Sequence, residues 1–193
     1  MNPLPTLLLA SASPRRRELL AQLEVNFRVA ATDIDESVIA GESPRDYVLR
    51  LSREKAVTGF IGNGRVLPAL GSDTIVLLDD KILGKPASRV EAEAMLQRLS
   101  GRTHHVYSAV ALAMNLDRVT DALNITAVTF ANIPGEWIKQ YCQGDEPMDK
   151  AGAYAVQGMT GQYIRRIEGS YSGVMGLPLF ETADLLRRAG LLV

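Results

Sequence analysis

The chain has 193 residues, of which 47% are hydrophobic and 22% charged, and its formal net charge is −1. This composition is ordinary for a globular protein, and the near-neutral charge disfavours bulk nucleic-acid binding, which usually needs a clear positive excess. Since the lone Cys142 excludes an internal disulfide and no apolar run reaches the roughly 20 residues of a membrane span, we expect one cytoplasmic domain over residues 1–193, with neither a nucleic-acid nor a membrane partner.

The N-terminal segment, residues 6–24, is predicted to form a short apolar strand, a small-residue turn and a helix. Ser13 suits the N-cap and Pro14 the first helical position. Arg15–Arg17 then places three cations in the first turn, where the helix dipole disfavours them. A bound anion would remove this conflict, because main-chain N–H groups, serine hydroxyls and guanidinium groups together suit phosphate. The alternative is a solvated basic face, and at most two of three successive arginines can share one site.

A second strand is predicted over Val25–Val29, and an acidic loop, Asp33–Ser37, follows it. Ser43 is expected to cap the next helix, whose inward apolar stripe continues to Lys55. Lys55 is therefore a candidate phosphate ligand, against the alternative of a surface lysine with a buried stem. Glu36, in the acidic loop, is either a cation ligand or an ordinary solvated residue.

Asp73 lies in a polar interruption, Gly71–Thr74, between two apolar runs, and we expect it at the start of a strand. A half-buried carboxylate is costly unless it is paired or binds a metal, so Asp73 is a candidate general base or magnesium ligand. The alternative is a turn aspartate bonded to its own backbone. With Glu36 it is a candidate pair for a hard cation, Mg²⁺ or Mn²⁺.

The rest of the chain mixes helices and strands without strict alternation, which favours a mixed α/β sheet. Predicted features are a hairpin turn at 79–80 followed by Lys85, a helix from Ser88 to Leu99, strands over 106–114, 119–130 and 163–167, a helix over 134–142, a functional or mobile loop over 144–161, a return strand over 174–177, and a final helix from Pro178.

Several familiar catalytic patterns are missing from the sequence, including the Walker phosphate loop, H-E-x-x-H and C-x-x-C. His104 and His105 are adjacent, so on a strand they point in opposite directions and do not chelate one metal. Cys142 has no histidine near it in sequence that favours a catalytic thiol. Any metal chemistry is therefore expected to use carboxylates rather than a zinc site.

Taken in order, these segments resemble the Maf family of nucleoside triphosphate pyrophosphatases, also described as septum-formation inhibitors. The resemblance spans essentially the whole chain and is carried by residues 9–16, Glu36, 54–56, 71–74, 84–86, 99–101, 149–154, 157–158 and 176–179. It implies a fold like that of inosine-triphosphate pyrophosphatases: a mixed, elongated sheet with flanking helices and a deep cleft between two lobes. It leaves a homodimer open.

The resemblance also implies roles for individual residues. Asp73 is expected to be the catalytic carboxylate, and whether it is base or metal ligand stays open. The expected phosphate ligands are Ser11, Ser13, Arg16, Lys55 and Lys85, and the expected metal ligands are Glu36 and Asp73. Arg15, Thr74 and Gln157 fall at specificity positions and match the branch that hydrolyses dTTP and UTP.

The expected reaction is hydrolysis of a pyrimidine nucleoside triphosphate, canonical or modified, to the monophosphate and pyrophosphate with Mg²⁺ or Mn²⁺. In the family this activity is connected with removal of modified nucleotides and with cell-division arrest. The alternative reading is a non-catalytic, nucleotide-binding regulator of septum formation.

Overall fold

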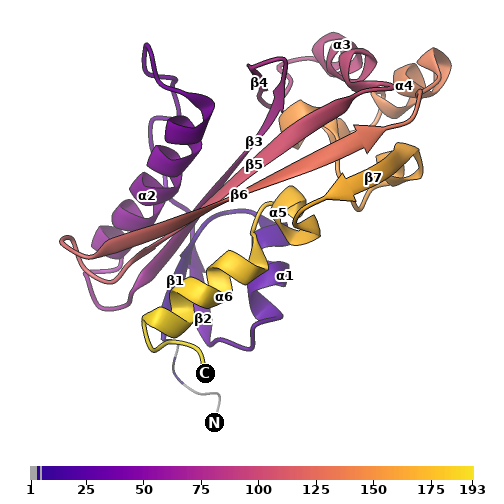
Figure 1. The fold of residues 1–193 in the computed structure, drawn as a ribbon. Coiled ribbons are helices and arrows are strands. Elements are labelled where there is room, and N and C mark those ends of the chain that lie inside the picture. Colours follow the sequence, from indigo (N-terminus) through magenta and orange to yellow (C-terminus); the bar gives the residue numbers. More distant parts are fainter. Residues whose placement is uncertain (1–3, 5) are drawn as a thin grey trace. The chain divides into compact units, whose positions relative to one another are not determined.

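The computed structural model describes residue 4 and residues 6–193, which form helices around a seven-stranded mixed sheet. The strand order is β2-β1-β3-β5-β6-β7, and β4 pairs with β3 (Figure 1). The strands are β1 (Leu7–Ala10), β2 (Phe27–Ala30), β3 (Ala69–Leu78), β4 (Lys81–Leu83), β5 (Thr103–Ala113), β6 (Val119–Phe130) and β7 (Ile164–Glu168). The α-helices are α1 (Pro14–Ala21), α2 (Pro44–Gly62), α3 (Arg89–Leu99), α4 (Gly135–Tyr141), α5 (Tyr171–Met175) and α6 (Leu179–Arg188).

The described residues form two compact units. The first runs up to Asp73 and adds residues 108–124 and 176–193; the second holds residues 74–107 and 125–175. Strands β3, β5 and β6 contribute residues to both. The predicted mixed sheet with flanking helices is confirmed, while the cleft between two lobes and the single domain over 1–193 stay predictions.

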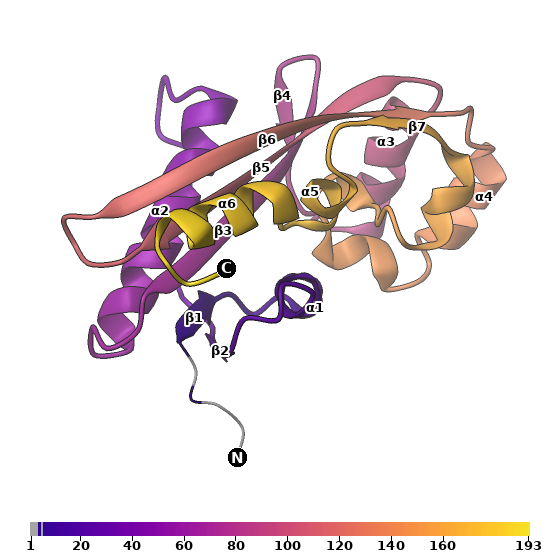
Figure 2. The ribbon, with the colours of Figure 1, turned by 60° about the horizontal axis from the view of Figure 1, so that its bottom comes forward.

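The first unit packs α2 against a parallel part of the sheet. Strand β1 pairs in parallel with both β2 and β3. Ala56 and Phe60 of α2 join Leu8, Ala69, Ala111 and Ala113 in one buried cluster. Helix α6 lies on the opposite face of these strands from α2 (Figures 1 and 2). Strand β1 is buried on both faces, which explains its unbroken apolar run.

Two helices of the first unit begin with the same Ser–Pro pair. Ser13 accepts a hydrogen bond from Arg16 N at 3.4 Å, and Ser43 accepts one from Asp46 N at 3.2 Å. The following prolines occupy the first helical turn, where their missing N–H costs nothing. Both predicted caps are confirmed.

The second unit has its own core, in which Leu96, Phe130 and Tyr154 are buried together. Strand β4 pairs antiparallel with β3, and β7 pairs antiparallel with β6. Ser88 caps α3 by accepting from Glu91 N at 3.2 Å, as predicted. His104 is buried while its neighbour His105 is exposed, so the two rings do point to opposite faces of β5.

Two local predictions were wrong. Gly71–Thr74 does not interrupt β3, because Ser72 Oγ donates to Ala109 O of β5 at 2.8 Å and Asp73 pairs with Lys55 of α2. The return strand expected over 174–177 is replaced by α5, whose first turn Ser170 caps by accepting from Gly173 N at 3.0 Å. The segment 144–161, expected to be a functional or mobile loop, contains short 3₁₀ turns over Glu146–Asp149 and Ala151–Ala153 and the start of a third over Met159–Tyr163, and its functional role stays a prediction.

In the part of the chain that the structure describes, every helix is too short or too polar to cross a membrane.

Candidate active site

The centre of the candidate site is a lysine placed between two carboxylates. Lys55 Nζ lies 2.6 Å from Asp73 Oδ1 and 2.7 Å from Glu36 Oε1. Lys55 and Asp73 are both buried, whereas Glu36 approaches from an exposed loop. Lys55 faces inward because it continues the buried stripe of α2, as the sequence predicted. The structure thus brings together three of the predicted site residues.

Burial raises the pKa of Asp73 above its ordinary value. The positive charges of Lys55 and Arg16 oppose this shift, and the negative charge of Glu36 adds to it. A carboxylate in this setting accepts a proton more readily than an exposed aspartate. Asp73 therefore has the environment of a general base.

The turn between β1 and α1 supplies hydroxyl and guanidinium groups in the same unit. Ser11 is buried, and its Oγ accepts from Ser13 N at 3.1 Å. Both serine oxygens accept from main-chain N–H groups, so each hydroxyl can still donate its hydrogen to an anion. Arg16 Nε donates to Gly176 O at 2.8 Å, which ties the guanidinium group to the segment just before α6.

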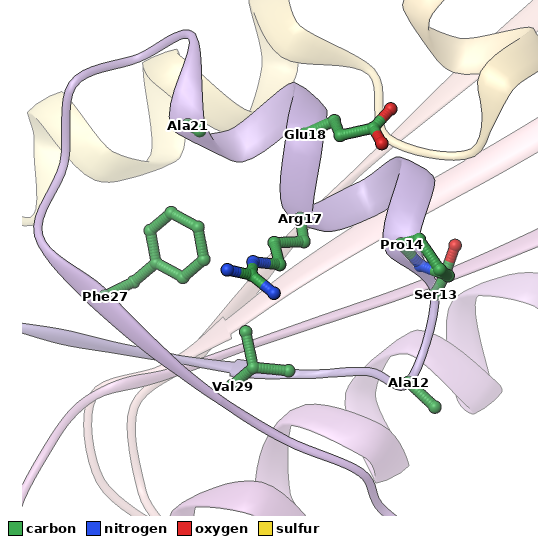
Figure 3. A pocket seen from close by; sticks show the side chains of 8 residues that line it. All are labelled: Ala12, Ser13, Pro14, Arg17, Glu18, Ala21, Phe27 and Val29. Atoms are coloured by element: carbon green, nitrogen blue, oxygen red, sulfur yellow. The ribbon is translucent and has the colours of Figure 1, made fainter.

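The three arginines of α1 have different surroundings. Arg15 and Arg16 are half-buried. Burial lowers the pKa of Arg16, and the charge of Asp73 opposes this shift. The charge of Arg16 in turn lowers the pKa of Asp73, so the two groups lie close together. Arg17 is exposed and points between Phe27 and Val29 into a surface hollow of about 810 Å³ (Figure 3). Of the predicted site residues, only Ser13 lines that hollow, so Arg17 belongs to a different surface.

The remaining predicted residues lie in the second unit. Thr74 is half-buried on β3, whereas Lys85 and Gln157 are exposed. Gly152 N donates to Gly84 O at 3.1 Å, which joins the turn of Lys85 to the segment that leads to Gln157.

The turn that carries Gln157 is tightly held. Thr160 Oγ1 and Gly158 N both donate to Ala155 O, at 2.7 and 3.0 Å. A Cβ atom at Gly158 would lie 1.9 Å from Glu146 Oε1, so only glycine lets this carboxylate approach the turn. Glu146 is in turn held by Tyr141 OH at 2.9 Å.

The donor set at Glu36 and Asp73 fits a magnesium-like cation. Among the described residues no three His, Cys, Asp or Glu side chains gather as a metal cluster. Mg²⁺ typically takes one or two carboxylates and completes its shell with water and substrate phosphates, so two carboxylates suffice. The thiol of Cys142 is buried, which raises its pKa to about 11 and disfavours the thiolate that a nucleophilic role requires.

Sequence reasoning assigned no role to four residues that shape the site. Ser72 Oγ donates to Gly176 O at 2.9 Å and joins β3 to the segment just before α6. Tyr47 and Arg50 hold the loop of Glu36 by donating to its main-chain carbonyls. Their signal in the sequence is weak, because each acts through a main-chain carbonyl. Only the packed fold shows which carbonyl lies within reach.

The architecture is similar to that of a HAM1 protein from Coxiella burnetii, which matches with a TM-score of 0.51 and 18% identity. The match covers 96% of this chain and 100% of that one, and it shows the fold alone. The family model described as Maf-like protein matches residues 6–189. The chain belongs to the Maf family, and the resemblance inferred from the sequence is confirmed.

Named relatives are similar over nearly their whole length. A dTTP/UTP pyrophosphatase of Bordetella avium (strain 197N) is 50% identical, with 99% of this chain and 98% of the relative covered. The dTTP/UTP pyrophosphatase of Escherichia coli (strain K12) is 50% identical over 94% and 91% of the two chains. That of Methylobacillus flagellatus is 52% identical over 96% and 93%.

Proposed function

We propose that this protein is a nucleoside triphosphate pyrophosphatase that hydrolyses dTTP and UTP to the monophosphate and pyrophosphate. Relatives about half identical over nearly the whole chain carry that name. The observation that carries the proposal is the buried Asp73–Lys55 ion pair, which the exposed Glu36 also contacts and which has Arg16 close to it. Charges buried in this way are costly for stability and are typical of a site that acts on an anionic substrate.

The proposed phosphate ligands are the cations and hydroxyls already described. Arg16, Ser11 and Ser13 offer donors at the N-terminus of α1, where the helix dipole favours an anion. Lys55 supplies a buried ammonium, and Lys85 a further cation from the second unit. The cations and hydroxyls of the first unit would neutralise the charge that develops on the leaving pyrophosphate.

A divalent cation, Mg²⁺ or Mn²⁺, is part of the proposal, and Glu36 and Asp73 are the residues that would hold it. When bound, such a cation withdraws charge from the phosphate oxygens and favours attack by water. Lys55 occupies both carboxylates in their present arrangement, so it competes with a cation for the same oxygens.

Asp73 is proposed to take the proton of the attacking water. Its raised pKa makes it a better proton acceptor than an exposed aspartate, while the positive charges of Lys55 and Arg16 favour its ionised form and oppose that rise. Lys55 also holds Asp73 Oδ1 in place at 2.6 Å.

Base selection is proposed for Arg15, Thr74 and Gln157. An amide such as that of Gln157 offers a donor and an acceptor, which suits the O4 and N3–H pattern shared by uracil and thymine. The exposure of Gln157 and the rigid hydrogen bonds around its turn support this role, because a reading group must be accessible and held still.

We extend the proposal to a cytoplasmic protein that binds no nucleic acid, with a homodimer left open. A free cysteine fits a reducing compartment, and the net charge of −1 disfavours nucleic acid. Light scattering after size-exclusion chromatography reads the assembly state.

The test uses purified protein, Mg²⁺ or Mn²⁺, and a panel of canonical and modified nucleoside triphosphates, with pyrophosphate and orthophosphate measured separately. Pyrophosphate release that is fastest with dTTP and UTP supports the proposal. Binding without turnover would favour the non-catalytic regulator, and orthophosphate as the sole product would identify a different phosphatase. Gln157→Ala should loosen base preference more than it slows the best substrate, so an unchanged profile would remove Gln157 from base selection.

A further inference from the structure

Helix α2 holds the loop of Glu36 through its main chain as well as through Lys55. Tyr47 OH donates to Glu36 O at 2.8 Å. One turn further along α2, Arg50 Nη2 donates to Ser37 O at 3.0 Å. Two consecutive carbonyls are therefore fixed by side chains at positions i and i+3, which share one face of the helix.

Arg50 is itself locked by a two-pronged pair with Glu42, at the far end of the same loop. Its Nε and Nη2 lie 2.7 and 2.8 Å from the two oxygens of Glu42, and Nη1 lies 3.3 Å from Glu54. Glu42 Oε2 also accepts from Ile39 N at 3.4 Å. These hydrogen bonds raise the pKa of Arg50 and lower that of Glu42, so both groups stay charged at neutral pH.

The anchoring explains how an exposed side chain keeps a defined place. The Glu36 side chain is 55% exposed, and neighbouring Val38 and Ile39 are exposed too, so packing does not hold this part of the loop. The bonds from Tyr47 and Arg50 tie the main chain on either side of the Glu36–Ser37 peptide to a rigid helix. A carboxylate on an untethered loop would lose its position relative to Lys55.

We propose that Arg50 and Tyr47 are positioning residues for Glu36: they hold its carboxylate against Lys55 so that it is in place when the triphosphate arrives. This inference rests on the proposed function only for its effect on turnover. Lysine cannot replace Arg50, because one ammonium does not reproduce the planar fork that reaches Glu42 and Ser37 O together.

The first experiment compares Arg50→Lys and Tyr47→Phe with a matched control, Arg53→Lys. Arg53 lies one turn along the same helix and pairs with Asp121 on the surface, away from the loop. We expect kcat/KM for dTTP to fall about ten- to a hundredfold in Arg50→Lys, as is typical when a partner that orients a ligand is lost, and less in Tyr47→Phe. Arg53→Lys should be unchanged. Equal effects at positions 50 and 53 would overturn the proposal.

A double-mutant cycle shows whether Arg50 acts through Glu36. In a Glu36→Gln background, Arg50→Lys should cost less than about twofold, because the group it positions has already lost its charge. A loss as large as that in the wild-type background would mean that Arg50 acts by another route, and the proposal would fail.

Amide hydrogen exchange tests the anchoring without any turnover. Exchange at Ile39 and its loop neighbours should speed up in Arg50→Lys and stay at the wild-type rate in Arg53→Lys. Unaltered loop exchange in Arg50→Lys would refute the positioning role even if dTTP hydrolysis were confirmed. If wild-type protein did not hydrolyse dTTP, the proposed function would fail, while faster exchange would still establish the anchor.

Discussion

Lys55 reaches Asp73 because α2 lies against β3 at a position that admits no side chain. Two residues before Asp73, a Cβ atom at Gly71 would lie 2.3 Å from Ser52 O and 2.4 Å from Ala56 N. Residues 71 and 73 share one face of β3, so the glycine that admits the helix and the carboxylate that faces Lys55 are neighbours. The ion pair therefore depends on main-chain packing as much as on charge.

Gly71→Ala should separate this pair. Both clashing atoms belong to the helix backbone and cannot rotate away, so α2 has to shift. We expect a loss of about 1–3 kcal/mol in the free energy of unfolding, typical of overpacking, and about a hundredfold lower kcat, which a displacement near 1 Å can cause. Gly62→Ala is the control, since its Cβ meets nothing within 4 Å. Chemical denaturation and steady-state kinetics read the two effects, and wild-type kcat in Gly71→Ala would contradict this account of the pair.

Asp73→Asn should lower kcat about 10²- to 10⁴-fold, the usual contribution of a general base, while substrate KM changes far less. In the wild type, the rate should rise with pH through a pKa above the ordinary aspartate value, because burial favours the protonated form of Asp73. The measurement is the pH profile of kcat/KM for dTTP. Wild-type turnover in Asp73→Asn would remove Asp73 from catalysis.

The same substitution should raise the melting temperature at neutral pH. A carboxylate whose pKa is raised on folding disfavours the folded state once it is ionised, and this penalty disappears as the pH falls below its folded pKa. The melting temperature of Asp73→Asn should therefore exceed that of the wild type at pH 8, and the difference should shrink on acidification. A variant that is less stable at every pH would mean that the Lys55 pair outweighs the cost of burial.

The candidate site could be read from the sequence where local rules apply. The cap at Ser13, the inward position of Lys55 and the misplaced charge of Arg16 all follow from helix geometry and the helix dipole. The strand through Gly71–Thr74 could not be read this way, because Ser72 finds its acceptors on β5 and at Gly176, remote in sequence. Local propensity predicts a polar interruption, whereas in the fold Ser72 bonds to distant carbonyls and Asp73 pairs with Lys55.

The roles of Tyr47 and Arg50 were out of reach for a related reason. Both donate to main-chain carbonyls of the Glu36 loop. Because every residue carries such a carbonyl, the sequence does not show which ones are bonded. The prediction of a return strand over 174–177 was wrong for a similar reason. Ser170 caps a helix there by accepting from Gly173 N, and the apolar pattern alone does not reveal this hydrogen bond. Hydrophobic pattern predicts which face is buried, but not which distant backbone group a polar side chain will meet.

His104 should make the protein less stable in acid. Burial lowers its pKa to about 4, while the ring titrates near 6.5 when exposed in the unfolded chain. The unfolded state therefore binds an extra proton between these values, and stability is lost as the pH falls from about 6.5 to 4, by about 3 kcal/mol for this group. The measurement is the free energy of unfolding of the wild type and of His104→Gln, obtained by denaturation at several pH values. The pH dependence of their difference isolates the effect. A difference that does not change with pH would show that the folded His104 ring takes up its proton as readily as the unfolded one.

Gly158→Ala should weaken base selection more than turnover. The added Cβ would meet Glu146 Oε1 at 1.9 Å, so either the Gln157 turn moves or Glu146 leaves Tyr141. Burial raises the pKa of Tyr141, so its phenol stays protonated and its bond to Glu146 resists that departure. We expect the ratio of kcat/KM for UTP over CTP to fall about five- to tenfold, the worth of one hydrogen bond near 1 kcal/mol. Gly135→Ala, whose Cβ meets nothing within 4 Å, should keep the wild-type ratio. If Gly158→Ala keeps it too while its circular dichroism stays native, the position of this turn does not govern which base is accepted.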